Sequence, residues 1–198
     1  MTSIETKQLL IETGARLFHQ NGYNNTGIAE ILSASGIPKG SFYFHFKSKE
    51  DFALTVIDHY SQFLKGWFDQ YAEDTNKSPL TRLRNFLESF IVFYEGSGCR
   101  LGCPIGNFAL EMSDLSEPIR KKINSVLLLI RDSIETIIKD AKSMGEIPME
   151  INTLDIADFI MSSWEGALLV MKSGKSTEPL KRFINILFTY ILTTNNRA

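Results

Sequence analysis

The chain has 198 residues, slightly more than one typical domain, and a core of that size needs no disulfide or metal to hold it together. Hydrophobic residues make up 43% and charged residues 22%, a balance typical of globular proteins that excludes a collagen, a disordered tail and a disulfide scaffold. The formal net charge of −2 argues at first against a nucleic-acid partner, but a sum over the whole chain averages over domains.

The sequence also bears on location. No apolar run reaches the roughly 18 residues that a membrane span needs. Residues 1–8 show no cationic segment followed by an apolar one, as a signal peptide would. Two cysteines fit a reducing compartment better than an oxidising one. We therefore expect a cytoplasmic protein without a membrane partner.

Apolar residues recur at three- and four-residue spacing along most of the chain, which is the period of helices and not of strands. In chain order, the main apolar segments lie within 9–18, 52–64, 80–94, 119–138, 156–164 and 183–191. Cap-and-proline pairs that begin helices occur at 78–79, 116–118 and 177–179. Gly145 and Gly174 are predicted to end helices. These patterns predict an all-α fold of about nine helices without a strand.

A domain boundary is predicted near residue 50, because three short helical segments precede it and longer ones follow. Within the first part, residues 26–46 have the spacing of a helix-turn-helix. One short helix is predicted from Thr26 to Ala34, Gly36 supplies a positive φ in the turn, and a second helix starts at Pro38. The predicted domains are therefore 1–50 and 51–198.

The second short helix carries hydrogen-bonding side chains, and lysines follow it. Lysines neutralise phosphates, hydroxyls donate to phosphate oxygens, and polar side chains at a helix start reach base edges in the major groove. Within 39–49 there are three lysines and no acid, so the basic charge concealed in the whole-chain sum is concentrated there. We expect Phe42 and Phe46 to be buried core aromatics, and we interpret His45 as a surface hydrogen-bonding residue rather than a metal ligand.

A longer set of motifs comprises Gly22-Tyr23, Thr26, the segment 36–46 and Lys49-Glu50. This set closely resembles the TetR family of bacterial transcriptional repressors, and the resemblance covers residues 5–55. The resemblance implies a three-helix DNA-binding head and a C-terminal helical domain that binds ligand and dimerises. By position it implies phosphate contacts from Thr26, Tyr43 and Lys49, and a recognition-helix surface made of Lys39, Gly40, Ser41, Phe44 and His45.

Residues 96–107 form a glycine-rich segment with two cysteines between two helical patterns. Cys103 precedes Pro104, which suits the first position of a helix, so Cys103 is predicted at or near the helix N-cap. The helix macrodipole and the nearby Arg100 would favour a thiolate there, which predicts a thiol that reports oxidants or electrophiles. The alternative is a small buried cysteine that fills a tight turn. A disulfide or a zinc site is disfavoured.

Cys103, Gly106 and Asn107 match a Gly-Cys-x-x-Gly-Asn segment that resembles a branch of the same family, some of whose members respond to electrophiles and oxidants. Modification of Cys103 is then expected to shift the heads of a dimer and weaken DNA binding. Aromatic residues of the C-terminal domain, among them Phe108 and Trp164, either line an apolar ligand cavity or form core. Glu165 and Lys172, close to Trp164 in sequence, either reach into such a cavity or lie at the surface, and the surface position is the expectation.

The segments 153–172 and 178–193 carry more apolar residues than one helix face needs, which predicts a two-fold four-helix interface in a homodimer. The predicted function is a repressor of double-stranded operator DNA, released by an unidentified small molecule or electrophile, with no enzymatic activity, cofactor or metal. One alternative is a cysteine-dependent enzyme, although no His or acid is placed in sequence to suggest a dyad. Another is a helical ligand carrier without DNA binding, which Lys39, Tyr43 and Lys49 argue against.

Overall fold

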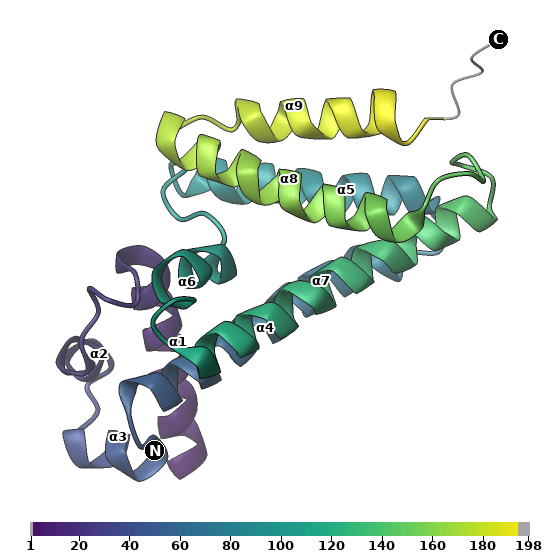
Figure 1. The fold of residues 1–198 in the computed structure, drawn as a ribbon. Coiled ribbons are helices and arrows are strands. Elements are labelled where there is room, and N and C mark those ends of the chain that lie inside the picture. Colours follow the sequence, from purple (N-terminus) through teal and green to yellow (C-terminus); the bar gives the residue numbers. More distant parts are fainter. Residues whose placement is uncertain (1, 194–198) are drawn as a thin grey trace. The chain divides into compact units, whose positions relative to one another are not determined.

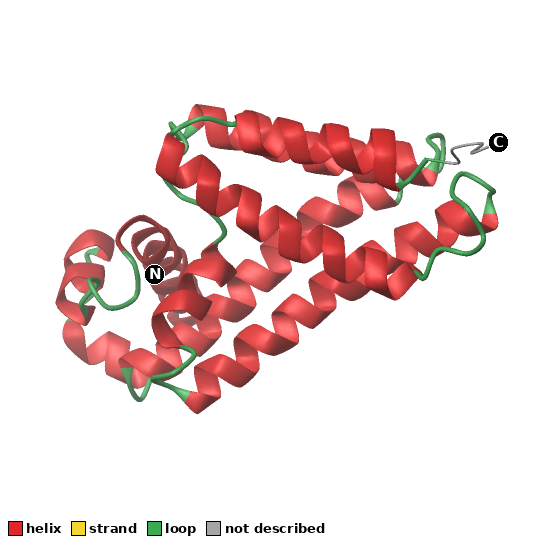
Figure 2. Ribbon diagram, turned by 45° about the horizontal axis from the view of Figure 1, so that its top comes forward, coloured by secondary structure: helices red, strands yellow, loops and turns green. Residues whose placement is uncertain are grey.

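The computed structural model describes residues 2–193, and within that range the chain consists of helices joined by loops and turns and contains no strand (Figure 2). The helices are α1 (Ser3–Asn21), α2 (Ile28–Ser35), α3 (Lys39–His45), α4 (Lys49–Ala72), α5 (Pro79–Gly96), α6 (Pro104–Met112), α7 (Glu117–Ser143), α8 (Thr153–Gly174), α9 (Glu178–Ile186) and the π-helical η1 (Leu187–Ile191). The predicted all-α fold of about nine helices is confirmed. None of the helices in this range combines the length and apolar character needed to cross a membrane.

The packing of the helices divides the chain into two compact units. The first comprises Met1–Leu64 with Pro104–Val126, and the second comprises Lys65–Cys103 with Leu127–Ala198. The first unit therefore contains the predicted head together with α6 and the beginning of α7 (Figure 1). The division of function at residue 50 stays a prediction.

Side chains satisfy the free backbone N–H groups where several helices begin. Thr2 and Glu5 form a capping box at the start of α1. Ser78 accepts a hydrogen bond from the backbone of α5, which begins with proline. The Ser116 hydroxyl accepts one from the third residue of α7 at 3.2 Å. The cap-and-proline patterns thus mark real helix starts.

Helix ends agree less well with the sequence patterns. Gly145, with φ of 73°, follows α7 as predicted. Gly174 is instead the last residue of α8, and Lys175 adopts the left-handed conformation with φ of 51°. The last predicted helix, 178–193, is α-helical only to Ile186 and continues as the π-helical η1. Periodicity locates a helix but does not fix the residue at which its hydrogen bonding changes.

The core of the first unit is a cluster of phenylalanines from α1, from α3 and its end, and from α4. The Phe52 ring centre lies 5.8 Å from that of Phe18, 5.3 Å from Phe42 and 4.8 Å from Phe46. None of these four side chains is more than 2% exposed, which confirms the prediction that Phe42 and Phe46 are core aromatics. Tilted and edge-to-face pairs of this kind each add about 0.5–1.5 kcal/mol beyond the burial of their area.

The second unit has its own aromatic core, which joins α4, α5, α8 and α9. The Phe90 ring centre lies 4.4 Å from that of Trp67 and 5.7 Å from that of Trp164. Trp164 in turn lies 5.6 Å from Phe183. Apolar burial between these helices is the main force that holds the unit together.

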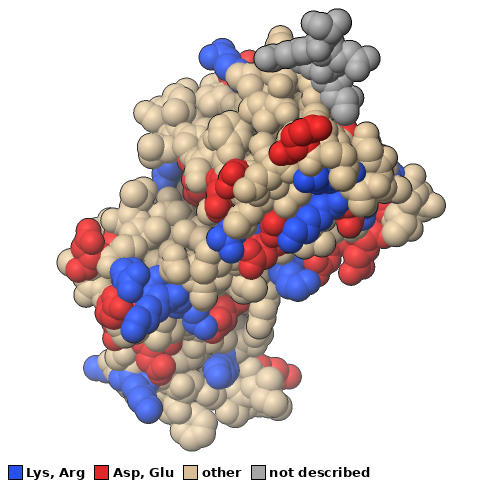
Figure 3. Space-filling model, turned by 45° about the vertical axis from the view of Figure 1, so that its right-hand side comes forward, with Lys and Arg blue, Asp and Glu red and all other residues tan. Residues whose placement is uncertain are grey.

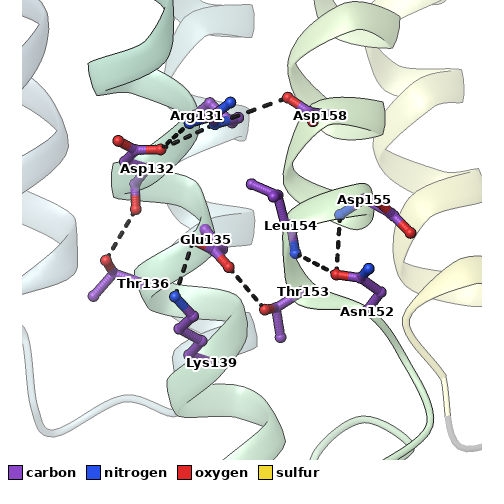
Figure 4. A network of polar contacts seen from close by, with 10 residues as sticks. All are labelled: Arg131, Asp132, Glu135, Thr136, Lys139, Asn152, Thr153, Leu154, Asp155 and Asp158. Atoms are coloured by element: carbon purple, nitrogen blue, oxygen red, sulfur yellow. Dashed lines mark hydrogen bonds and ion pairs between the residues drawn. The ribbon is translucent and has the colours of Figure 1, made fainter.

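A polar network links α7 to α8 in the same unit (Figure 4). The Glu135 carboxylate accepts a hydrogen bond from the Thr153 hydroxyl at 2.9 Å and pairs with Lys139 at 3.0 Å. These two contacts, Lys139 first, hold the pKa of Glu135 below its ordinary value. Basic and acidic side chains are likewise interspersed on the face of the molecule drawn in Figure 3. Because Lys139 is exposed, its ion pair with the half-buried Glu135 adds little to stability.

Gly14 permits the close approach of α1 to Phe52, because a Cβ at this position would lie 2.3 Å from the Phe52 ring. We expect Gly14→Ala to lower the free energy of unfolding by about 1–3 kcal/mol through overpacking. Urea denaturation followed by circular dichroism measures the change. The control is Gly66→Ala in α4, where a Cβ meets no atom within 4 Å and alanine is the better helix former. A Gly14→Ala protein as stable as Gly66→Ala would contradict the proposed packing.

Candidate nucleic-acid interface and cysteine site

The helix-turn-helix is formed by α2 and α3 (Figure 1). Gly36, with φ of 68°, ends α2 in the left-handed conformation, as predicted from the sequence. Pro38 precedes α3 at its N-cap. Phe42 is the buried residue of α3 and packs in the phenylalanine core, so the orientation of this helix depends on that contact.

The predicted recognition-helix residues lie largely on the solvent side of α3. Lys39, Gly40, Tyr43 and Phe44 are exposed, with Tyr43 49% and Phe44 78% accessible, while Ser41 and His45 are half-buried. The first turn of α3 contains no acid. The face opposite the core therefore offers an ammonium, hydroxyls and aromatic rings, a combination that suits a DNA groove and its phosphates.

Thr26 and Lys49, which the resemblance places at DNA phosphates, make hydrogen bonds within the head. Thr26 is buried, and its hydroxyl donates to the Gly22 carbonyl at 2.8 Å. The half-buried Lys49 amine donates to the Tyr23 carbonyl at 2.6 Å and lies 4.1 Å from the centre of the Tyr23 ring. Burial lowers the pKa of Lys49, and Glu111 partly offsets this. Phosphate contacts by Thr26 and Lys49 stay predictions.

Helix α6 packs against the head within the first unit. Phe108 lies edge-on to Phe18, with 5.6 Å between ring centres. The Glu111 carboxylate accepts a hydrogen bond from the Asn24 backbone N–H at 2.9 Å. It lies so close to the turn between α1 and α2 that a Cβ on Gly22 would be 2.6 Å from one of its oxygens. No sequence pattern indicated this role for Glu111, because its partner lies 87 residues away.

The cysteine segment connects α5 to α6, and Cys103 is the residue directly before Pro104, the first residue of α6. This is the helix-start position predicted from the sequence. The two cysteines form no disulfide; Cys99 is buried and Cys103 is half-buried. Among the described residues, no group of three His, Cys, Asp or Glu side chains has the arrangement of a metal site.

Cys103 lies beside an acidic side chain from a distant helix. It makes a hydrogen bond with the side chain of Glu165 in α8. Burial raises the pKa of Glu165, and the hydrogen bond from Cys103 lowers it in part. Burial also raises the pKa of Tyr94, and negative charge on Cys103 and on Glu165 adds to that effect. Glu165 was expected at the surface, but it is half-buried, and its charge and that of Cys103 both reach Tyr94.

The sequence predicted a helix start and Arg100 as the influences on this thiol, and the structure adds an acid to them. Arg100 is exposed, and Glu165 is one of the groups beside Cys103. A carboxylate next to sulfur disfavours a second negative charge, whereas a helix start favours one. The remaining predicted sensor residues are divided between the units, with the buried Trp164 in the second and Asn107 and Phe108 in the first.

Comparison with known proteins identifies the family. Residues 10–56 match the family of "Bacterial regulatory proteins, tetR family", and residues 79–187 match the "Tetracyclin repressor-like, C-terminal domain". This chain belongs to the TetR family. It is 32% identical to the transcriptional repressor DhaR of Mycobacterium sp. (strain GP1) over 97% of this chain and 95% of DhaR. It is 27% identical to the repressor NemR of Escherichia coli over 91% of this chain and 90% of NemR.

Solved structures of TetR-family regulators have the same fold. A regulatory protein from Rhodobacter sphaeroides, 32% identical, superposes with a TM-score of 0.86 over 91% of this chain and 95% of that one. The reduced form of E. coli NemR, 25% identical, gives a TM-score of 0.84 over 91% and 93%. The protein is therefore a TetR-family transcriptional repressor, and such regulators bind operator DNA as homodimers.

Replacing Lys49 by methionine, which keeps the aliphatic stem and removes the charge, tests the predicted phosphate contact. We expect Lys49→Met to weaken binding to operator and to unrelated duplexes by the same factor, and to reduce the salt slope by about 1. Fluorescence anisotropy at several salt concentrations measures both. The exposed Lys65→Met, on the same helix and in the other unit, is the control and should bind as the wild type does. A loss confined to the operator would contradict a phosphate role.

Proposed function

We propose that this repressor leaves its operator when an electrophile or oxidant modifies Cys103. The observation that carries the proposal is the position of Cys103, a half-buried thiol immediately before the helix that packs on the DNA-binding head. A group added to sulfur occupies space at the Glu165 carboxyl and removes the hydrogen bond between the two side chains. Non-covalent binding of a small molecule at the same site is the related alternative.

The signal then travels along α6. Because Cys103 is bonded to Pro104, a displacement of the thiol moves the beginning of α6. Phe108 and Glu111 transmit the movement to Phe18 and to the turn at Asn24. The phenylalanine core passes it to α3. A changed separation of the two recognition helices in a dimer lowers operator affinity by shifting the population away from the DNA-binding arrangement.

The similarity to NemR supports this proposal at the level of the family. The solved NemR structure is described as a reduced form, which assigns a redox state to that protein. The match of Cys103 and Asn107 to the Gly-Cys-x-x-Gly-Asn segment points in the same direction. We infer that this chain shares a response of that kind.

We further infer that two copies associate through α8 and α9, as the excess of apolar residues predicted. A shallow apolar groove lies between these helices and is lined by residues that include Phe159, Gly166, Val170, Phe183 and Ile186. Val170 is 56% exposed and Ile186 is 42% exposed. A second copy would remove this surface from water in a four-helix interface.

Cys103→Ser tests the sensor directly. In anisotropy measurements with the DNA that flanks the protein's own gene, N-ethylmaleimide is expected to release the wild type and the Cys99→Ser protein. The Cys103→Ser protein should bind with the same affinity and remain bound, because it lacks the reactive sulfur. Release of Cys103→Ser to the same extent as the wild type would refute the sensor role.

Measuring the amount of electrophile consumed beside DNA release separates a sensor from an enzyme. No sequence pattern indicated an acid near a cysteine, but Glu165 lies beside Cys103 in the structure. This proximity favours a cysteine-dependent enzyme as the second candidate. A sensor consumes one equivalent of electrophile per chain. Multiple turnover of the electrophile without any change in DNA binding would favour the enzyme.

Val170→Glu tests the dimer interface. A charge introduced into this apolar interface must lose its water on association, so sedimentation should show a monomer at concentrations where the wild type is a dimer. The matched control is Leu129→Glu on α7, which is 59% exposed and outside the groove, and it should remain dimeric. A dimeric Val170→Glu protein would place the interface elsewhere.

A further inference from the structure

Phe44 is the most exposed phenylalanine within residues 2–193, and it stands in the helix-turn-helix. Its side chain is 78% accessible, whereas that of Phe42, two residues earlier, is fully buried in the core of the head. Successive residues of an α-helix are about 100° apart, so Phe44 lies about 200° around α3 from Phe42. Single apolar side chains are common on protein surfaces, but this one lies directly opposite the core, at the centre of the face that is turned to DNA.

Gly40 and Phe44 form one row along this exposed side, because residues four apart lie on the same face of a helix. Gly40 is itself exposed. A Cβ built on Gly40 would meet no atom of another side chain or helix within 4 Å, so the space beside its backbone is open to a group of that size. The central row therefore carries no hydrogen-bonding side chain and permits close approach.

Polar side chains flank the central row on both sides. Lys39 and Tyr43 form the row on one side, and Ser41 and His45 form the row on the other. The Phe44 ring lies edge-on to His45, with 5.0 Å between ring centres and an interplanar angle of 83°. The lysines and hydroxyls of this region suit phosphates. The flanking rows can therefore hold the DNA backbone while the central row faces the base edges.

The chemistry of the major groove limits what the Phe44 ring can recognise. A helix-turn-helix places its second helix in that groove, where the base edges present hydrogen-bonding groups and the C5-methyl group of thymine. Phenylalanine has no group that donates or accepts a conventional hydrogen bond. A polar base edge or a phosphate pressed against the ring would lose water without gaining a bond in return. The thymine methyl is the group whose burial against the ring is favourable.

We propose that Phe44 is a specificity-determining residue of this repressor, and that it recognises the C5-methyl group of a thymine in each half of the operator. Gly40 assists this contact because it leaves the adjoining backbone uncovered. The contact of Phe44 determines which DNA is bound, whereas the proposed role of Cys103 is in release. The two roles are therefore independent.

The test removes thymine methyl groups without changing the order of the bases. A duplex from the DNA that flanks the protein's own gene is made once with thymine and once with uracil, which lacks only the methyl group. Fluorescence anisotropy without any electrophile gives the two dissociation constants. Burial of one methyl is worth about fourfold in affinity, so two half-sites predict that the wild type prefers the thymine duplex by about 10- to 20-fold.

Phe44→Ala should weaken binding to the thymine duplex and bring the two dissociation constants to within about twofold of each other, because the ring that buries the methyl is gone. Because Phe44 is exposed, this change should leave the helical circular dichroism of the protein unaltered. Phe44→Leu keeps an apolar side chain and should retain part of the preference, which provides a second variant with a smaller change at the same position.

Two further variants are controls. Tyr43→Phe removes the neighbouring hydroxyl and should weaken both duplexes equally, so that the full preference for thymine remains. Leu110→Ala removes another exposed apolar side chain of the first unit, 81% accessible on α6, and should bind both duplexes as the wild type does.

Single uracil substitutions then locate the contact. The preference should come from thymines at symmetry-related positions in the two half-sites. Where a T·A pair at such a position is exchanged for C·G, 5-methylcytosine should bind about fourfold more tightly than cytosine, because its methyl group occupies the same place in the groove. This gain should be absent in Phe44→Ala.

Equal binding of the thymine and uracil duplexes by the wild type would overturn the proposal. A preference for thymine that Phe44→Ala leaves unchanged would overturn it too, since the methyl groups would then be recognised by another residue or through the shape of the DNA. Neither result bears on release by modification of Cys103. Conversely, a preference that depends on Phe44, in a protein that electrophiles do not release, would support this contact and refute the proposed function.

Discussion

The contact of α6 with the head, made by Phe108 against Phe18, is the interaction on which the proposed mechanism depends. Phe18 belongs to the same aromatic cluster as Phe52 and Phe42, so the packing that folds the head also joins it to α6. Glu111 adds a directional hydrogen bond to the Asn24 backbone. Close-packed interiors transmit displacement because they have little free volume to absorb it.

The environment of Cys103 sets a second constraint. A helix start and an acidic neighbour act on the thiol in opposite directions, and the acid comes from α8, which also carries the proposed dimer surface. A change at the sulfur therefore bears both on α6, through Pro104, and on α8, through Glu165.

Much of this fold could be predicted from the sequence, because its dominant forces are local or periodic. Apolar spacing located the helices, and cap residues located their starts. The aromatic run of the second short helix indicated that Phe42 and Phe46 are buried while Tyr43 is exposed. The prediction failed by one residue at Gly174, where the left-handed conformation falls on Lys175.

The functional contacts were harder to predict because they join residues far apart in the chain. Glu165 lies on a helix whose apolar period assigns it no partner, and only the fold brings it to Cys103. Glu111 reaches Asn24 for the same reason. For Thr26 and Lys49 the family resemblance implied a role at DNA in advance. The structure shows that each side chain also makes a hydrogen bond inside the head.

Amide hydrogen exchange at Asn24 is the sharpest test of a signal that passes through α6, because the hydrogen bond from this N–H to Glu111 links that helix to the head. Exchange at Asn24 would be compared before and after N-ethylmaleimide modifies Cys103 in the Cys99→Ser protein. We predict faster exchange at Asn24 after modification, together with loss of operator binding. Operator release with unchanged protection at Asn24 would show that the signal takes another route, and would contradict the proposed mechanism.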